Sequence, residues 1–207
     1  MNKKDLLKKI RIYLKKFGLD IRKYQLRPMN YFMKEYFAKK GLIGIEIGVE
    51  YGEHALETLK NLNIKRIYLI DPYSVYDDYQ EGIQKIRTKE NQTNAKKFAR
   101  RLLKKYKDKI VWINKKSGDA SKDVSEKVDF VYIDGNHEYN FVKKDIEKYS
   151  PLVKRRGIIG GHDFRNYSEK GGEEIFGVFK AVMGWILKRK GKLFVNNDWW
   201  IIKNEKN

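Results

Sequence analysis

The sequence predicts a doubly wound α/β fold, in which a mostly parallel sheet of seven strands has helices on both faces. Short apolar runs of strand length alternate with segments whose apolar residues recur at helical spacing. Such alternation favours parallel strands joined by crossover helices. Two further runs near the C-terminal end are separated by a turn so short that they can only form an antiparallel hairpin.

The parallel strands are expected over residues 42–49, 66–71, 109–114, 128–134 and 157–161, with helices over 53–62, 93–107 and 138–149. Pro151 and Gly157 mark the last helix-to-strand connection, because such residues commonly follow a helix end. Residues 73–89 are polar and aromatic, which indicates a loop with some helix.

After Gly171 and Gly172, apolar residues at helical spacing predict another helix. Its apolar side consists of Ile175, Phe176, Val178, Phe179, Val182, Met183 and Ile186. The hairpin follows, with strands over 192–195 and 199–202 around a turn at Asn196 and Asn197.

Two helices are expected ahead of the first strand, over residues 6–17 and 29–37, each followed by a glycine. They predict an N-terminal helical cap over residues 1–40. Residues 41–207 contain no repeat and no linker, so they are expected to form a single globular unit.

The composition excludes several classes of protein. The chain of 207 residues is 41% hydrophobic and has no cysteine, so it can bury a core but has neither disulfides nor thiolate metal sites. No signal peptide or membrane-length apolar run is visible, which favours a cytoplasmic protein.

The net charge of +19 arises from 46 basic and 27 acidic residues. A diffuse basic surface attracts nucleic acid or anionic membranes, although a merely solvated surface explains it equally well. The densest group comprises Lys96, Lys97, Arg100, Arg101, Lys104 and Lys105.

A glycine motif ends the first strand, with Gly48 directly after the strand and Gly52 before the next helix. Such glycines let the backbone approach a ligand and expose helix N–H groups, although a tight turn alone has the same pattern. A dinucleotide loop would place a glycine near position 50. The carboxylates of Glu50 and Glu53 would repel a pyrophosphate but tolerate a cationic sulfonium.

Two further acidic residues follow strands. Asp71, before Pro72, ends the second strand about twenty residues after the glycine loop, where it can accept hydrogen bonds from both hydroxyls of a ribose. A turn cap is the equally plausible alternative. Asp119 and Ala120 follow the third strand and could hold an adenine amino group, or simply form a turn.

The fourth and fifth strands each deliver an acid and a histidine. Asp134 and His137 follow one strand, and His162 and Asp163 follow the other. The carboxyl ends of parallel strands share one edge of the sheet, where ligands of such folds bind. With His54 near the glycine motif, all three histidines fall at this edge, although a structural role is favoured for His54.

Together these motifs, over residues 46–52, 69–73, 118–120, 128–139 and 160–164, resemble the class I S-adenosylmethionine (SAM)-dependent methyltransferases. The sequence is most similar to the small-molecule and sugar O-methyltransferases (methyltransferase domain family 24-like), whose fourth strand ends in Ile-Asp-Gly-x-His-x-Tyr. The resemblance covers residues 41–203 and implies a Rossmann-like fold and SAM as cofactor.

The resemblance also implies roles for single residues. The methionine and ribose part of SAM would contact Glu46, Gly48, Glu50, Gly52, Asp71 and Pro72. Asp119 and Ala120 would contact the adenine, and Asp134 would lie beside the reacting methyl group. Glu50 departs from the pattern, because many methyltransferases have glycine there.

Methyl transfer to an alcohol needs a base or a metal ion to remove the hydroxyl proton. In one version His162 or His137 is the base, and Asp134 or Asp163 orients the imidazole. In the other, Asp134 and Asp163 bind a divalent ion such as Mg²⁺, with His162 as a further candidate ligand. The small number of oxygen ligands favours the metal-independent version.

The acceptor is expected to be a hydroxyl of a sugar or glycan-linked small molecule. Tyr73, Tyr139 and Arg165 are candidate substrate-binding residues, and Tyr76, Tyr79 and Tyr167 offer further flat faces for sugar rings. The alternatives are a nucleic-acid methyltransferase and a non-catalytic SAM-binding subunit, while an NAD-linked enzyme is disfavoured by the glycine spacing. The sequence leaves the oligomeric state open.

Overall fold

The computed structural model describes residues 26–38, 40–75, 88–164, 173–188 and 192–204, with only the backbone for 173–176. The expected helix over 6–17 and most of the expected loop over 73–89 lie outside these residues, as do Arg165 and Tyr167.

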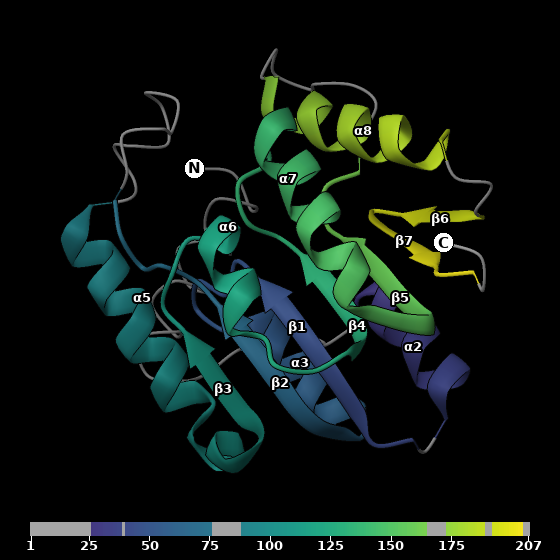
Figure 1. The fold of residues 1–207 in the computed structure, drawn as a ribbon. Helices are drawn as coiled ribbons and strands as arrows, with labels where there is room; N and C mark the ends of the chain where they lie inside the picture. Colours follow the sequence, from purple (N-terminus) through teal and green to yellow (C-terminus); the bar gives the residue numbers. More distant parts are fainter. Residues whose placement is uncertain (1–25, 39, 76–87, 165–172, 189–191, 205–207) are drawn as a thin grey trace, which may run out of the picture.

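The sheet has seven strands in the order β3-β2-β1-β4-β5-β7-β6 (Figure 1). The strands are β1 (Leu42–Ile47), β2 (Ile64–Ile70), β3 (Ile110–Ile113), β4 (Val128–Ile133), β5 (Val153–Gly161), β6 (Leu193–Asn196) and β7 (Asp198–Ile202). β1 to β5 are parallel, whereas β7 is antiparallel to both β5 and β6. The mostly parallel sheet with a terminal hairpin is therefore confirmed.

Helices cover both faces of the sheet. The α-helices are α2 (Pro28–Phe37), α3 (Glu53–Asn61), α5 (Lys89–Leu102), α6 (Ser117–Ala120), α7 (Tyr139–Tyr149) and α8 (Glu173–Ile186), and the 3₁₀ turns are η1 (Lys104–Lys109), η2 (Ser121–Asp123) and η3 (Ser150–Leu152). One apolar cluster joins the sheet to α7 and α8, and the other joins it to α2, α3 and α5. Because helices cover both faces, β1 and β4 are buried along their whole length, which explains their continuous apolar runs.

Some element boundaries differ from the sequence-based expectation. α5 begins at Lys89 rather than at 93, because the Thr88 hydroxyl caps it by accepting a hydrogen bond from the Asn91 N–H at 3.1 Å. β5 begins at Val153 rather than at 157, because Val153 already pairs with β4 before a shift in register.

β1 and β4 are neighbours in the sheet although β2 and β3 lie between them in the chain. After β1 the chain forms β2 and β3 on one side of that strand, and it then crosses to the other side of β1 to form β4 and β5. The connections that follow these two strands therefore lead toward opposite edges of the sheet, and a cleft opens at the carboxyl ends of β1 and β4. This is the edge at which the sequence motifs were expected to meet.

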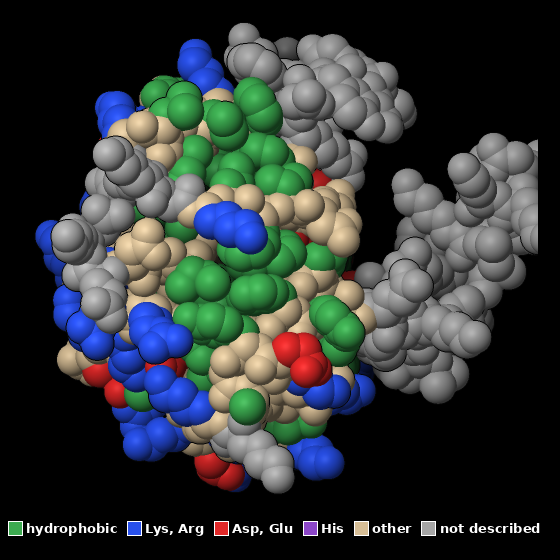
Figure 2. Space-filling model, turned by 90° about the vertical axis from the view of Figure 1, so that its right-hand side faces the viewer, with side chains coloured by type: hydrophobic (Ala, Val, Ile, Leu, Met, Phe, Trp, Pro, Cys, Tyr) green, Lys and Arg blue, Asp and Glu red, His purple; other side chains and the backbone are tan. Residues whose placement is uncertain are grey.

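The helix α2 and the terminal hairpin pack against each other. Met29 and Met33 of α2 are fully buried, and Phe32 contacts Phe194 and Trp200 with ring centroids 5.2 and 5.4 Å apart. Figure 2 shows apolar side chains over much of this edge of the molecule, with Lys and Arg side chains around them. In the part of the chain that the structure describes, no helix combines the length and the apolar character that a membrane crossing requires.

Candidate active site

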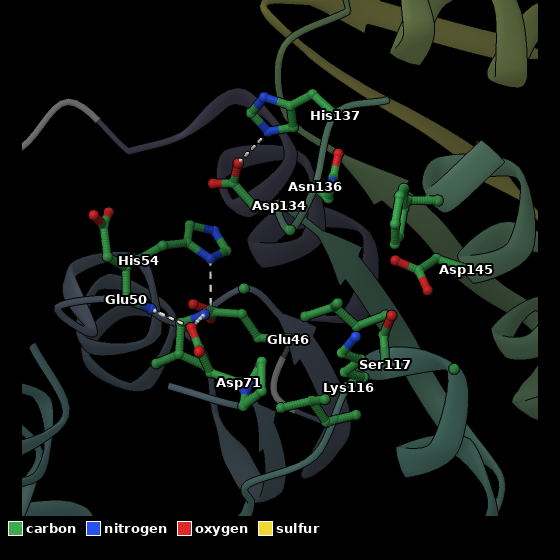
Figure 3. Close-up of a pocket in the computed structure, with 18 of the residues that line it drawn as sticks. Glu46, Glu50, His54, Asp71, Lys116, Ser117, Asp134, Asn136, His137 and Asp145 are labelled. Carbon is green, nitrogen blue, oxygen red and sulfur yellow. Dashed lines mark hydrogen bonds and ion pairs between the residues drawn. The ribbon is translucent and has the colours of Figure 1, made fainter. Parts of the chain in front are cut away.

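A cavity of about 590 Å³ lies at the carboxyl ends of β1 and β4 (Figure 3). Its volume lies within the range of about 300–1,000 Å³ that is typical of small-molecule sites. The loops after β1, β2 and β4 line it, together with α6, the first turns of α7, and Arg27 ahead of α2.

The glycine loop needs both of its glycines. Gly48 has a φ of 84°, and any side chain at this position would collide with the Asp134 carbonyl, so the loops after β1 and β4 can approach only without one. Gly52 has a φ of 77° and is the N-cap of α3. The backbone of this loop thereby lies directly against the cavity.

The Asp71 side chain holds the same loop in place through hydrogen bonds to its backbone. Its Oδ2 accepts hydrogen bonds from the N–H groups of Val49 and Glu50 at 3.0 and 2.9 Å, and its Oδ1 accepts one from the Tyr73 N–H at 2.8 Å. The capping role that the sequence left open is therefore present, and it places the carboxylate at the cavity wall next to Pro72.

Tyr73 lies behind this loop rather than among the residues that line the cavity. Its side chain is buried, and its hydroxyl donates a hydrogen bond to the Glu50 carbonyl at 3.0 Å. Burial, followed by the nearby charge of Asp71, raises the pKa of the Tyr73 hydroxyl. Tyr139 also lies outside the lining, with its ring centroid 4.9 Å from Nζ of Lys180.

Glu46 and His54 form a buried ion pair at the floor of the cavity. Glu46 is 1% exposed, and its Oε2 lies 3.0 Å from Nδ1 of His54. The imidazole stacks on Tyr132 at 3.8 Å, and its Nε2 lies 3.2 Å from Nδ2 of Asn30. Burial alone would lower the pKa of His54, but the charge and hydrogen bond of Glu46 raise it above the ordinary value.

The four acid and histidine residues after β4 and β5 lie together. His137 is held between two carboxylates, with Nε2 3.4 Å from Oδ1 of Asp134 and Nδ1 3.6 Å from Oδ2 of Asp163. His162 approaches Asp163 from the other side, with 3.3 Å between Nε2 and Oδ1. Of these four residues, Asp134 and His137 line the cavity. Figure 3 shows their side chains at its end beyond β4.

Asp198, at the start of β7, is a residue that the sequence motifs missed. It is fully buried, and its Oδ1 lies 3.0 Å from Nδ1 of His162 and accepts a hydrogen bond from the Tyr132 hydroxyl at 3.0 Å. Its Oδ2 accepts one from the Met29 N–H at 3.2 Å. The carboxylates near His162 are thus Asp163 and Asp198, and Asp134 faces His137 instead.

Arg27 is a second missed residue. Its guanidinium lies 3.9 Å from the Asp134 carboxylate and 3.6 Å from that of Asp198, and it donates a hydrogen bond to the Tyr132 hydroxyl. Burial alone would raise the pKa of Asp134, but a hydrogen bond from His137 and the positive charges around it hold that pKa below its ordinary value. Asp134 is therefore ionised at neutral pH.

The other end of the cavity is formed by α6 and α7. Asp119 is exposed at its rim, whereas Ala120 is fully buried and its N–H donates to the Lys116 carbonyl at 3.0 Å. Asp145, on α7, and Asn136, in the loop after β4, also line the cavity, although no motif had indicated them. An isolated asparagine and a helical aspartate carry no distinctive sequence signal.

The charges of the lining favour a cationic ligand. Carboxylates come from Glu46, Glu50, Glu53, Asp71, Asp119, Asp134 and Asp145, and cationic side chains from Arg27, Lys116 and Lys144. A pyrophosphate would be repelled by this set, whereas a sulfonium with an amino group fits it. Within the described ranges no group of three or more acidic or histidine residues is arranged to hold a metal ion, since Asp134 and Asp163 both face His137.

Comparison with known proteins agrees with this geometry. The sequence matches the family described as a methyltransferase domain over residues 45–164. No curated protein sequence matches the chain.

Solved structures share the fold. A proposed caffeoyl-CoA O-methyltransferase from Staphylococcus aureus is 15% identical with a TM-score of 0.62, over 99% of this chain and 93% of the other. A proposed rRNA methylase from Clostridium thermocellum is 15% identical with a TM-score of 0.59, over 84% and 95%. The MycE methyltransferase of the mycinamycin pathway, in complex with Mg and SAH, is 16% identical with a TM-score of 0.54, over 89% and 52%.

Proposed function

Because the chain belongs to the methyltransferase domain family and is a SAM-dependent methyltransferase, we propose that it methylates a hydroxyl group of a sugar or glycan-linked small molecule. The observation that carries the proposal is the position of His137, between two carboxylates at the end of the cavity. A neutral hydroxyl is a poor nucleophile, so its methylation needs a base at this place.

Several features of the cavity fit SAM. The acidic lining matches its two cationic groups, and Gly48 lines the cavity where its methionine part would lie. Arg27 is the cationic side chain nearest to Asp134 in the lining and suits the methionine carboxylate. Glu46, Glu50, Asp71 and Pro72 line the cavity and would contact the rest of the methionine and ribose, whereas Gly52 does not line it. When bound, SAM supplies an electrophilic methyl group on its sulfonium.

The residues of the chain would supply alignment and proton transfer. In our proposal, Nε2 of His137 accepts the proton of the acceptor hydroxyl, and Nδ1–H points to Asp163, which fixes the tautomer. The hydrogen bond from Nε2–H to the ionised Asp134, at 3.4 Å, belongs to the imidazolium that this transfer forms, and it stabilises that cation. His162 acts indirectly, because it lies between Asp163 and Asp198 and holds the Asp163 carboxylate in position.

A sugar acceptor is supported by the aromatic surface beside the cavity. Tyr51 lines the cavity and is 36% exposed, and its ring contacts Phe98 edge-on at 5.8 Å. Flat aromatic faces with a hydroxyl suit the apolar faces and hydroxyls of sugar rings.

RNA is the second candidate acceptor. On α5 and β3, Arg100 lies 5.0 Å from the ring centroid of Trp112 and Arg101 lies 5.7 Å from that of Phe98, which gives a basic surface with aromatic groups. One of the structures with the same fold is described as a proposed rRNA methylase. This candidate predicts turnover that falls steeply with salt.

The test is transfer of labelled methyl groups from SAM to a panel of sugars, nucleotide sugars, catechols and RNA. We expect turnover with a sugar hydroxyl, and His137→Ala should lower kcat by at least about 100-fold with unchanged affinity for S-adenosylhomocysteine (SAH). Asp108→Asn, an exposed substitution in η1, is the control. Transfer to RNA alone would refute the sugar proposal, and full activity of His137→Ala would refute the assigned base.

Metal dependence is tested in the same assay. In the metal-independent version, EDTA leaves turnover unchanged. Loss of turnover with EDTA and recovery with Mg²⁺ would instead assign Asp134 and Asp163 as metal ligands.

A further inference from the structure

We propose that Asn136 and Asp145 recognise the adenine of the cofactor as a donor–acceptor pair. Asn136 donates to a ring nitrogen next to the exocyclic amino group, and Asp145 accepts from that amino group. The proposal rests on the assignment of SAM as cofactor and names the residues that select its base.

Asn136 has a buried donor without a partner. The side chain is 7% exposed and lines the cavity, and its Oδ1 accepts a hydrogen bond from the Glu138 N–H at 2.8 Å. That bond fixes which end of the amide faces away from the loop. Its Nδ2 is buried and has no hydrogen-bond partner among the described residues. Because buried donors are nearly always paired in native proteins, a ligand acceptor is the expected partner.

Asp145 offers the matching acceptor. It is 3% exposed, lies on α7 and lines the same cavity, where the Ser117 side chain forms a hydrogen bond to it. Burial raises the pKa of Asp145 to about 7. Figure 3 shows Asp145 on the side of the cavity toward α6 and α7, across from Glu50 and Asp71, and Asn136 between Asp145 and the Asp134 loop.

The groups that the sequence motif had suggested for the adenine are less suited to this task. The Ala120 N–H already donates to the Lys116 carbonyl, and Ala120 does not line the cavity. Asp119 is exposed at the rim, where water competes for its oxygens. Asn136 and Asp145 are instead buried, and buried hydrogen-bonding groups discriminate strongly against a ligand that leaves them unpaired.

Adenine fits such a pair because its amino donor lies next to a ring-nitrogen acceptor on both sides, N1 and N7. A base with a carbonyl oxygen at this position would direct an acceptor at the Asp145 carboxylate. The pair would therefore select adenosyl over inosyl cofactors.

The test measures the affinity of the wild-type protein for SAH and its analogues by isothermal titration. Removing the ring nitrogen that Asn136 contacts, in either the 1-deaza or the 7-deaza analogue, should weaken binding at least tenfold, whereas the 3-deaza analogue serves as control. Asn136→Asp keeps Oδ1 for the Glu138 N–H but lacks the donor. It should weaken SAH binding at least tenfold and abolish the discrimination against that deaza analogue.

Asp145→Asn provides a gain-of-function measurement. An asparagine can donate to a carbonyl oxygen, so the ratio of affinities for SAH and S-inosylhomocysteine should shift by at least tenfold toward the inosyl compound. The rival variant Asp119→Asn should leave this ratio within threefold. A shift in Asp119→Asn rather than in Asp145→Asn would overturn the proposal.

These outcomes distinguish a failure of the cofactor assignment from a failure of the roles given to Asn136 and Asp145. If wild-type protein does not bind SAH, the cofactor assignment fails and the proposal fails with it. If it binds SAH but neither the 1-deaza nor the 7-deaza analogue is weakened, the cofactor assignment stands and the role of Asn136 is refuted. The analogue series uses unmodified protein, so misfolding of a variant cannot obscure this result.

Discussion

Asp198→Asn should strongly destabilise the fold although it changes only one oxygen to an NH₂ group. Asp198 is fully buried at the start of β7. Its carboxylate accepts hydrogen bonds from the Met29 N–H and the Tyr132 hydroxyl, lies 3.0 Å from Nδ1 of His162, and faces the Arg27 guanidinium at 3.6 Å. The substitution removes the charge while the shape stays almost the same.

The magnitude follows from these contacts. The asparagine oxygen can still accept from Tyr132 and His162, but its NH₂ group then faces the Met29 N–H, so a donor meets a donor. Loss of one hydrogen bond to a charged group costs about 1.5–3 kcal/mol, and an unsatisfied buried N–H costs about 1–3 kcal/mol. We therefore expect a loss of about 3–5 kcal/mol, the range for breaking a buried ion pair, out of a total stability of about 5–15 kcal/mol.

The measurement is urea unfolding at neutral pH, followed by two spectroscopic probes. The midpoint of Asp198→Asn should fall with little change in the slope m. Asp108→Asn, at an exposed position, should stay within about 0.5 kcal/mol of wild type. A loss below about 1 kcal/mol for Asp198→Asn at unchanged m would show that this carboxylate does not hold the surrounding elements together.

Further predictions concern the cofactor site and one helix. Gly48→Ala should abolish SAH binding, measured by titration, because its methyl group would collide with the Asp134 carbonyl; affinity within threefold of wild type would contradict this. Burial raises the pKa of Asp145 to about 7, because it outweighs the hydrogen bond from Ser117 and the charge of Lys148. The protonated carboxyl therefore stabilises the fold at a pH below the ordinary pKa of an aspartate, and this contribution is lost as the pH rises through about 7. Because the amino donor of adenine favours the ionised carboxylate, SAH should bind about tenfold more tightly at pH 8 than at pH 6. Binding should also release a proton, which titrations in buffers of different ionisation enthalpy measure. Asp145→Asn should show neither effect. Thr88→Ala should cost about 1 kcal/mol in urea unfolding, because it removes the cap of α5; unchanged stability would show that this cap contributes little.

The order and type of the described core strands could be predicted from the sequence because each has a continuous apolar run between clear breakers. Boundaries were less predictable. β5 extends back to Val153 through a register shift with β4, which a sequence window cannot detect. The start of α5 could have been read from Thr88, whose hydroxyl side chain is a typical N-cap.

The acid and histidine cluster was predictable because strand ends bring distant motifs to one edge. Asp198 was not, because its contact with the Met29 N–H joins residues 169 positions apart and depends on the antiparallel pairing of β7. That the Ala120 N–H is not free to bind a ligand could not be predicted either, because it depends on the single turn of α6, in which this N–H donates to the Lys116 carbonyl. Roles that depend on non-local pairing or on one hydrogen bond have no periodic signal in the sequence.

The contacts of Arg27 and Asp198 have a consequence for how this active site could evolve or be transplanted. Both residues lie outside the segment that matches the family, residues 45–164, yet they flank the Tyr132 hydroxyl and lie next to Asp134 and His162. The segment that matches the family therefore does not contain the whole site. A chimera that carried residues 45–164 into another scaffold would need a matching cation and carboxylate from the new flanks, and homologues that change one of the pair should change the other.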